Sequence, residues 1–219
     1  MKSAVRTDFL GIGFILATLL AFALDQPIAR AMAGMNPFVL RIARFVTWFG
    51  QGGVILYPAG ITILAGLSIR YLIPDLDKHL DNPIKKTAST FIVVAAAGLS
   101  DDVLKIVFGR ARPYLWLAGD QSGFHFFRIG ARFASFPSGH TTTSVAAALV
   151  FSAIFPRLCP AFWGAAVLIG LTRVLLDLHY LSDVFAGASL AWIITPPLIV
   201  KLRNCGWLPT SNRTHAEET

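Results

Sequence analysis

Apolar stretches separated by short polar segments occupy most of this chain of 219 residues. The six apolar runs are Phe9–Leu24, Phe45–Ile69, Thr87–Ser100, Thr141–Phe155, Ala161–Thr172 and Val184–Val200. A helix that crosses a bilayer needs about 20 mostly apolar residues, so only the second run is long enough unaided. The third run must continue through Asp101 and Asp102 to about Val107, and the fifth must include Arg173 and reach about Leu178. The pattern predicts an all-α fold, an integral membrane bundle of six transmembrane helices.

The overall composition agrees with a membrane location. Hydrophobic residues make up 55% of the chain and charged residues only 14%, and the mean hydropathy is +0.62, whereas a soluble domain of this length carries about 25% charged residues. We find no linker, so we expect residues 1–219 to form a single membrane-embedded domain. The net charge of +7 does not indicate nucleic-acid binding, because the cations flank apolar segments and form no basic stripe. Cys159 and Cys205 match no metal-ligand spacing and are expected to be structural residues without a disulfide.

The two ends of the chain carry separate expectations. Residues 8–25 form an apolar first helix preceded by Lys2 and Arg6, and Ala21-Phe22-Ala23 resembles the cleavage site of a signal peptide. We favour a retained first helix, because the later spans need no separate export signal. We expect residues 204–219 to form a flexible tail.

The distribution of lysine and arginine predicts an orientation in the membrane. With the N-terminus in the cytoplasm, ten of these residues lie on the cytoplasmic side and nine on the opposite side. Three of the nine, Lys105, Arg112 and Arg173, belong to the candidate site described below. The remaining bias places that site on the outer face of a bacterial-type inner membrane. Residues 75–83 are expected to form a polar cytoplasmic loop.

Three short stretches at the expected outer face carry residues that could do chemistry. They are KIVFGRARP with Lys105 and Arg112, PSGH with Ser138, Gly139 and His140, and TRVLLDLHYLSD with Arg173, His179 and Asp183. Lysine and arginine give charge-assisted hydrogen bonds to an anion, and the planar guanidinium suits phosphate oxygens. The three cations therefore predict an anionic ligand.

The start of the fourth predicted helix is suited to the same anion. Pro137 stops any preceding helix, and Gly139 lets the backbone approach a ligand closely. The N–H groups of Ser138, Gly139 and His140 would then be free to form an anion cradle. We therefore expect this helix start to bind the negative group directly.

The two histidines predict a reaction at the bound anion. His179 and Asp183 are four residues apart, so on the sixth helix they would share a face, and the carboxylate could hold one ring nitrogen. The other ring nitrogen would be free to attack, and His140 would protonate a leaving oxygen. Because three cations can stabilise the charge, this arrangement favours phosphoryl transfer without a metal. The sequence shows no metal-ligand cluster and no cofactor motif.

The three stretches, in this order, resemble the signatures of the type 2 phosphatidic acid phosphatase superfamily. Those signatures are Lys-x6-Arg-Pro, Pro-Ser-Gly-His and Ser-Arg-x5-His-x3-Asp, and the superfamily includes bacterial membrane lipid phosphatases and the vanadium haloperoxidases. The resemblance extends to the six-helix layout and so covers nearly the whole chain. Thr172 stands where the family usually has serine, which leaves only a fine positioning role in question.

The resemblance implies a role for each matched residue. His179 would be the nucleophile that forms a phosphohistidine, Asp183 would orient it, and His140 would act first as general acid and then as base. The remaining matched residues would bind the phosphate, namely Lys105, Arg112, Ser138, Gly139 and Arg173. The partners implied are the bilayer and a phosphorylated membrane lipid, of the undecaprenyl diphosphate, lipid A, phosphatidylglycerol phosphate or phosphatidate class. Neither a metal nor another cofactor is implied.

Two other functions fit part of the pattern. A vanadate-dependent haloperoxidase would use a similar anion pocket, but the apolar spans count against it because those enzymes are soluble. A protein that binds or transports a phosphorylated lipid would keep the cations, but it has no need for His179 and Asp183. The sequence does not rank the candidate lipids and does not predict an oligomeric state.

Residues beside the signatures are assigned simpler roles. Arg110 and Arg132 are expected to be interface charges, and Asp101, four residues before Lys105, is expected to form a supporting ion pair with it. Residues 114–136 are rich in aromatic side chains. An interfacial aromatic belt explains them better than a lid over a lipid head group.

Overall fold

The computed structural model describes residues 2–73 and 77–209, and within these ranges all regular structure is helical, without a β-strand. The helices are α1 (Lys2–Ala21), α2 (Asp25–Met32), α3 (Pro37–Trp48), α4 (Gly52–Leu72), α5 (Asp77–Phe108), α6 (Pro113–Leu117), α7 (Gly139–Ile154), α8 (Cys159–Leu175) and α9 (Leu181–Asn204). The predicted all-α class is therefore confirmed. Residues 210–219, most of the expected tail, lie outside the described part of the chain.

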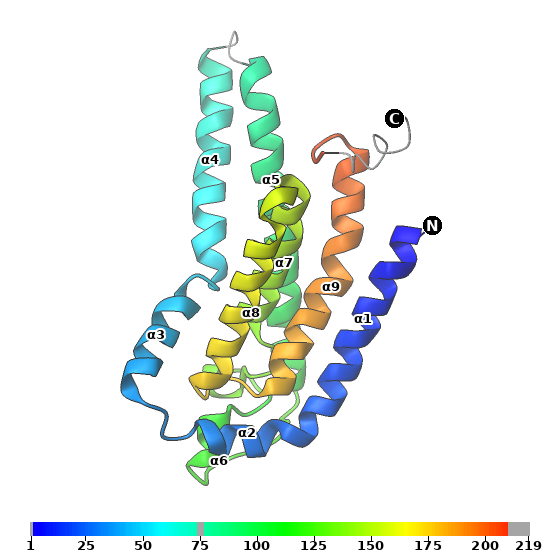
Figure 1. The fold of residues 1–219 in the computed structure, drawn as a ribbon. Helices are drawn as coiled ribbons and strands as arrows, with labels where there is room; N and C mark the ends of the chain where they lie inside the picture. The colour runs from blue at the N-terminus through cyan, green and yellow to red at the C-terminus, as the bar shows by residue number, and fades with distance from the viewer. Residues whose placement is uncertain (1, 74–76, 210–219) are drawn as a thin grey trace.

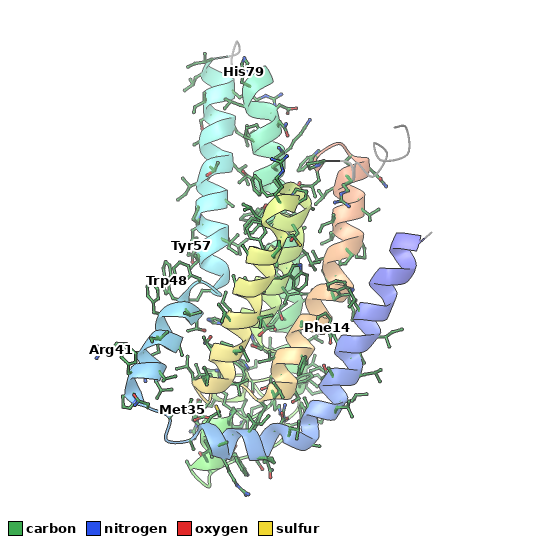
Figure 2. The ribbon with its side chains drawn as sticks, in the orientation of Figure 1. Phe14, Met35, Arg41, Trp48, Tyr57 and His79 are labelled. Atoms are coloured by element: carbon green, nitrogen blue, oxygen red, sulfur yellow. The ribbon has the colours of Figure 1, made fainter. Side chains whose placement is uncertain are left out.

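Four helical segments of the described chain are long and apolar enough to cross a membrane, namely Leu10–Met32, Pro37–Leu72, Pro156–Leu175 and Leu181–Asn204. Their outer surfaces carry large apolar side chains, as Figure 2 shows for Trp48 and Tyr57, which is 76% exposed. A soluble protein rarely exposes apolar patches of this extent, so the chain has the character of a multi-pass membrane protein. The predicted count of six spans is not confirmed, because α5 and α7 are not among these segments.

The second apolar run was expected to form one helix over Phe45–Ile69, but the helix is interrupted at Phe49–Gln51, between α3 and α4. Gly50 lies at this break, tight against other helices. A Cβ atom on Gly50 would lie 2.5 Å from Cγ2 of Ile169 and 3.2 Å from Cδ2 of His140. The break therefore lets the chain turn where it contacts the start of α7 and the middle of α8.

Two further boundaries differ from the sequence prediction. The segment expected to be a polar loop at 75–83 is helical from Asp77 onward, because α5 begins there, and residues 74–76 lie outside the described residues. Helix α8 ends at Leu175 and does not reach Leu178. The stretch that carries His179 is consequently a loop between α8 and α9.

Helix α7 forms the centre of the bundle and packs against α5, α8 and α9 (Figure 1). Buried side chains occupy all sides of it, including Ala146, Ala148 and Val150. Small residues allow helix backbones to approach closely, which explains how a helix of 16 residues holds three longer neighbours. Helix α1 packs along α9, where the rings of Phe14 and Trp192 lie 5.7 Å apart.

Alternation of the helix directions brings four helix ends together. The C-terminal ends of α5 and α8 and the N-terminal ends of α7 and α9 meet at one end of the bundle, beside α2 and α6 (Figure 1). All three sequence stretches that carry candidate chemistry are located at this end. The N-terminus and the last described residues of α9 lie toward the opposite end (Figure 1).

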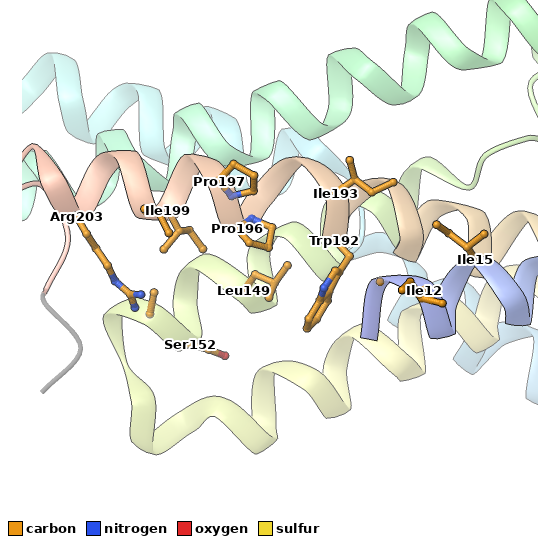
Figure 3. Close-up of a pocket in the computed structure, with 13 residues that line it drawn as sticks. Ile12, Ile15, Leu149, Ser152, Trp192, Ile193, Pro196, Pro197, Ile199 and Arg203 are labelled. Carbon is orange, nitrogen blue, oxygen red and sulfur yellow. The ribbon is translucent and has the colours of Figure 1, made fainter. Parts of the chain in front are cut away.

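A cavity of about 810 Å³ lies between α1, α7 and α9, away from this cluster of helix ends (Figure 3). Its walls are mainly apolar, with Ile12, Leu149 and Trp192 among them, and it reaches Arg203 near the C-terminal end of α9. None of the site residues predicted from the sequence lines it. This cavity is therefore separate from the candidate chemistry.

Candidate active site

The start of α7 supplies part of the expected anion cradle. In the described chain, the N–H groups of Gly139 and His140 donate to no backbone carbonyl, because the first residues of a helix have no partner one turn earlier. The N–H of Ser138 is not free, contrary to expectation, since it donates to the carbonyl oxygen of Asp183 at 3.0 Å. That bond ties the start of α7 to the start of α9 and leaves two N–H groups available to an anion.

Lys105 lies directly beside this helix start. A Cβ atom on Gly139 would lie 2.5 Å from Nζ of Lys105 and 2.7 Å from Oδ2 of Asp101, so only glycine fits without displacing the pair. Lys105 forms an ion pair with Asp101, which confirms the predicted supporting contact. Thr142 Oγ1 donates to the other oxygen of Asp101 at 3.2 Å, so the ammonium group is fixed from two helices.

Arg173 is buried near the end of α8, and only part of its guanidinium is engaged. NH1 donates to Oγ1 of Thr47 at 2.8 Å, whereas Nε is buried and has no partner within the described residues. A buried donor without an acceptor is costly, so Nε is available to an anion. Thr172, which departs from the family signature, donates its hydroxyl to the carbonyl of Ile169 at 2.6 Å within its own helix.

Arg112 is held by the backbone at the other side of the site. Its Nε donates to the carbonyl oxygen of Ala131 at 2.7 Å, and NH1 donates to that of Leu178 at 3.1 Å. Leu178 directly precedes His179, so this bond joins the cation to the loop between α8 and α9. An arginine side chain has five N–H donors, more than these contacts use, so further donors of Arg112 remain for a ligand.

His179 is buried in that loop, and its ring is held mainly by Ser135. Nδ1 lies 2.6 Å from the carbonyl oxygen of Ser135, and because a carbonyl only accepts, Nδ1 must carry the proton. The lone pair therefore resides on Nε2. Asp183 Oδ2 is 3.7 Å from Nδ1, beyond hydrogen-bond distance. The expectation that the two residues share a helix face was wrong, since α9 begins at Leu181.

Asp183 acts on the histidine through the backbone around it. Its Oδ2 accepts from the hydroxyl of Ser135 at 2.6 Å and from the N–H of Tyr180 at 2.8 Å. Ser135 in turn supplies the carbonyl that holds His179. The carboxylate thus fixes both segments that set the position of the imidazole.

The positive charges of the site act on His179 together. Burial lowers the pKa of His179 well below its ordinary value of 6.5, and the charges of Arg112, Arg173 and Lys105 lower it further, against a smaller opposing effect of the Ser135 hydrogen bond. His179 is therefore neutral at physiological pH, the state that nucleophilic attack by its ring would require.

His140 belongs to the same cluster. It interacts electrostatically with His179 and with all three cations of the site, Lys105, Arg112 and Arg173. The structure therefore gathers all the residues predicted from the three sequence stretches into one site.

A cavity of about 540 Å³ opens from this cluster between α4 and α5. Lys105, Gly139 and His140 line it together with the carboxylates of Asp101 and Asp102 and with apolar side chains such as Leu56 and Phe91. Its lining on α5 runs from Phe91 to Lys105, fourteen residues apart, which corresponds to about 21 Å along the helix. The cavity is therefore elongated, with charge toward one end and apolar walls along its length.

Sequence analysis missed the groups that surround the site. Arg110 was expected to be an interface charge, which is wrong, because it is 6% exposed and forms ion pairs with Asp183 and Asp25. Arg132, by contrast, is exposed and pairs with Asp120. Asp25 lies 85 positions from Arg110, and no spacing in the sequence connects them.

The aromatic loop before α7 is partly packed and partly exposed. Phe124 contacts the rings of Phe22, Phe108 and Phe136. Phe127 is exposed, as are neighbouring Phe126 and Ile129. Exposed aromatic side chains are common where membrane proteins meet the interface, and the choice between a belt and a lid stays a prediction.

Comparisons with known proteins agree with the geometry. Residues 86–206 match the family model of the PAP2 superfamily, which covers the three signature stretches. A lipid A 1-phosphatase of Rhizobium johnstonii is 32% identical over 203 residues, which represent 91% of this chain and 81% of that protein. A lipid A 1-phosphatase of Rhizobium etli is 41% identical over 122 residues, 55% of this chain and 52% of that protein.

One solved structure has a similar fold. It is the transmembrane PAP2-type phosphatidylglycerolphosphate phosphatase of Bacillus subtilis, with a TM-score of 0.58 and 22% identity, over 90% of this chain and 95% of that one. At this identity the likeness shows the fold alone. Taken with the family match and the relative of nearly full length, it leads to one conclusion: the chain belongs to the PAP2 superfamily of phosphatases.

Proposed function

We propose that this enzyme removes a phosphate from a membrane lipid whose head group reaches the site from the outer leaflet. The observation that carries the proposal is the cavity between α4 and α5, in which Lys105 and His140 share the lining with apolar side chains. A phosphorylated lipid has the same distribution, with an anionic head and apolar chains. A small soluble phosphate ester would have no use for the apolar walls.

Lipid A is the first substrate to test among the four candidate classes. Both curated relatives are named lipid A 1-phosphatases, and one of them matches 91% of this chain. The other three classes are undecaprenyl diphosphate, phosphatidylglycerol phosphate and phosphatidate. The likeness to the phosphatidylglycerolphosphate phosphatase is one of fold and does not rank phosphatidylglycerol phosphate above the others.

In the first chemical step Nε2 of His179 attacks phosphorus while the bond from phosphorus to the lipid oxygen breaks. His140, which takes up a proton when the negative phosphate binds beside it, gives that proton to the departing lipid oxygen, so the lipid leaves as a neutral hydroxyl. Lys105, Arg112 and Arg173 bind the non-bridging oxygens, and the N–H groups of Gly139 and His140 add to their charge stabilisation. The product is a phosphohistidine on residue 179.

In the second step water attacks the phosphohistidine. His140, now neutral, takes a proton from the water, the bond between Nε2 and phosphorus breaks, and inorganic phosphate leaves. Both histidines return to their starting states. Because the five donors supply the charge stabilisation, the reaction requires neither a metal nor another cofactor.

The membrane arrangement is part of the proposal. We propose that α5 and the central helix α7 cross the bilayer together with the four apolar segments, which gives six spans. The lysine and arginine distribution then places the N-terminus in the cytoplasm and the site at the periplasmic face of the inner membrane.

A panel of phosphorylated lipids tests the proposal. Purified enzyme in detergent is given each of the four lipid classes and a soluble phosphate monoester, and released phosphate is measured. We expect the highest kcat/KM for lipid A and at least a tenfold lower value for the soluble ester. Equal rates for the ester and the lipids would contradict a lipid substrate.

The matched control is His179→Ala. A protein that only binds or transports phosphorylated lipid would keep its affinity in this variant and show no phosphate release in either form. Vanadate, which resembles phosphate in a five-coordinate transition state, is expected to inhibit phosphate release. Peroxidase activity in the presence of vanadate would favour the haloperoxidase alternative.

A further inference from the structure

A buried network of charges behind the site links the N-terminal helices to the catalytic loop. Arg110 NH1 donates to Oδ1 of Asp183 at 2.5 Å, and NH2 donates to Oδ2 of Asp25 at 2.7 Å. Asp25 also accepts from the backbone N–H of Ser182 at 2.9 Å and from its hydroxyl at 2.6 Å. All four residues are buried.

The guanidinium of Arg110 is enclosed as well as paired. Its centre lies 4.3 Å from the ring of Tyr180, 4.9 Å from Phe22 and 5.1 Å from Phe124. These rings cover the faces of the cation while the two carboxylates hold its edges. A planar guanidinium stacks its faces on rings while its edge N–H groups donate to carboxylates, a geometry that the compact ammonium group of lysine lacks.

The charge balance of this network is informative. Two carboxylates face one guanidinium, so the group carries one net negative charge. If Arg110 had Asp183 as its single partner, it would neutralise the carboxylate beside His179. Asp25 offsets the charge of Arg110, and the carboxylate 3.7 Å from Nδ1 therefore keeps its effect on the imidazole.

We infer that Arg110 and Asp25 are positioning residues for the nucleophile, an inference that rests on the proposed function of His179. Attack by Nε2 places a positive charge on the imidazole ring, and a net negative network beside Nδ1 stabilises that charge. The network also fixes Ser182 and Asp183 at the start of α9, directly after the loop that carries His179. In the proposed mechanism neither Arg110 nor Asp25 contacts the phosphate.

The inference gives the N-terminal segment a part in catalysis. Asp25 is the first residue of α2, and Phe22, which stacks on Arg110, follows α1 directly. Cleavage within Ala21-Phe22-Ala23, the signal-like motif, would detach this segment from α1, which packs along α9. After such cleavage Asp25 would remain on α2, whereas Phe22, one of the rings on Arg110, would no longer be joined to it.

The test compares Asp25→Asn, which removes the charge at nearly constant shape, with Thr18→Ala. Thr18 Oγ1 lies 3.4 Å from Oγ of Ser189 and contributes to the packing of α1 on α9 away from the network. Lipid phosphate release and thermal unfolding are measured for both. We expect Asp25→Asn to lower kcat about 10- to 100-fold, the range seen when an outer partner that orients a metal-bound histidine is lost, with KM within twofold. Thr18→Ala should lower the melting temperature and leave kcat within twofold.

A double variant separates positioning from general damage. If Arg110 and Asp25 act as one unit, Arg110→Gln combined with Asp25→Asn should lower kcat no further than Arg110→Gln alone. Should Asp25→Asn fail to fold, Ser182→Ala decides. The Ser182 hydroxyl accepts from NH1 of Arg110 at 2.7 Å and donates to Asp25 at 2.6 Å, so its loss should lower kcat several-fold.

Two results would overturn the inference. One is wild-type kcat in folded Asp25→Asn or, where that variant does not fold, in Ser182→Ala. The other is a loss of kcat that follows the loss of melting temperature equally in Asp25→Asn and Thr18→Ala. His179→Ala keeps this outcome distinct from a failure of the proposed function. Phosphate release by that variant would show that His179 is not the nucleophile.

Discussion

Nδ1 of His179 lies 2.6 Å from the backbone carbonyl oxygen of Ser135, closer than the 3.7 Å that separates it from the carboxylate of Asp183. A backbone carbonyl cannot be removed by substitution and cannot titrate, so the tautomer with Nε2 free is fixed by the fold. The carboxylate supports this bond from behind through the hydroxyl of Ser135. The relationship leads to predictions that differ from those for a histidine bonded directly to a carboxylate.

Asp183→Asn is expected to lower kcat by about 10- to 100-fold. The carbonyl of Ser135 still holds the reactive tautomer in this variant, whereas loss of a directly bonded aspartate costs about 10⁴-fold because the tautomer is lost. Steady-state phosphate release measures the effect. A loss of about 10⁴-fold would mean that the carboxylate, and not the carbonyl, orients the ring.

The ionisation of His179 can be observed directly. Because burial and the charges of Arg112, Arg173 and Lys105 lower its pKa, the ring stays neutral as the pH falls through 6.5 and takes a second proton only well below that value. Nitrogen-15 NMR of histidine-labelled protein, assigned with His179→Ala, should show a neutral ring protonated on Nδ1 at pH 6.5.

Removing one cation of the site should raise the pKa of His179. Lys105→Gln takes away one of the charges that oppose protonation, so the pKa of His179 should rise. Arg157→Gln, a change at an exposed residue of the short 3-10 helix before α8, should leave it unchanged. A His179 signal that titrates near 6.5 in the unaltered protein would contradict the electrostatic description of the site.

Gly139→Ala is expected to reduce activity on the order of 10²-fold, the effect of displacing a catalytic group by about 1 Å. The new methyl group would occupy the space of the Lys105 ammonium and the Asp101 carboxylate. Phosphate release and a crystal or cryo-EM structure of the variant would check both statements. Gly164→Ala is the matched control, because a Cβ there meets nothing within 4 Å and should leave kcat unchanged.

Chelators are expected to leave the activity intact. The charge stabilisation in the proposed mechanism comes from Lys105, Arg112, Arg173 and two backbone N–H groups, so excess EDTA should change kcat by less than twofold. The measurement is phosphate release before and after dialysis against the chelator. Strong loss of activity that Mg²⁺ restores would contradict a mechanism based on fixed cations.

The sequence predicted the composition of the site better than its geometry. The ion pair of Lys105 with Asp101 follows from helical spacing alone, because both residues lie on α5. The contact of His179 with Ser135 could not be predicted, since it joins loops 44 positions apart. Helical spacing suggested that His179 and Asp183 share a face, but α9 starts two residues after the histidine.

The fold shows the same division between local and long-range information. Apolar runs predicted an all-helical membrane protein, which follows from composition and period. The break between α3 and α4 depends on how closely Gly50 approaches Ile169 and His140, which are distant in the sequence. Arg110 looked like an interface charge because its two carboxylate partners come from α2 and α9.

The most direct test of the account is to trap the phosphoenzyme. Enzyme mixed with lipid A labelled with ³²P in the scissile phosphate is quenched within one turnover, digested and analysed by mass spectrometry. The account predicts an acid-labile, base-stable phosphate on residue 179, and neither labelled protein nor phosphate release with His179→Ala. Phosphate on another residue, or turnover by that variant, would contradict the claim that His179 is the nucleophile.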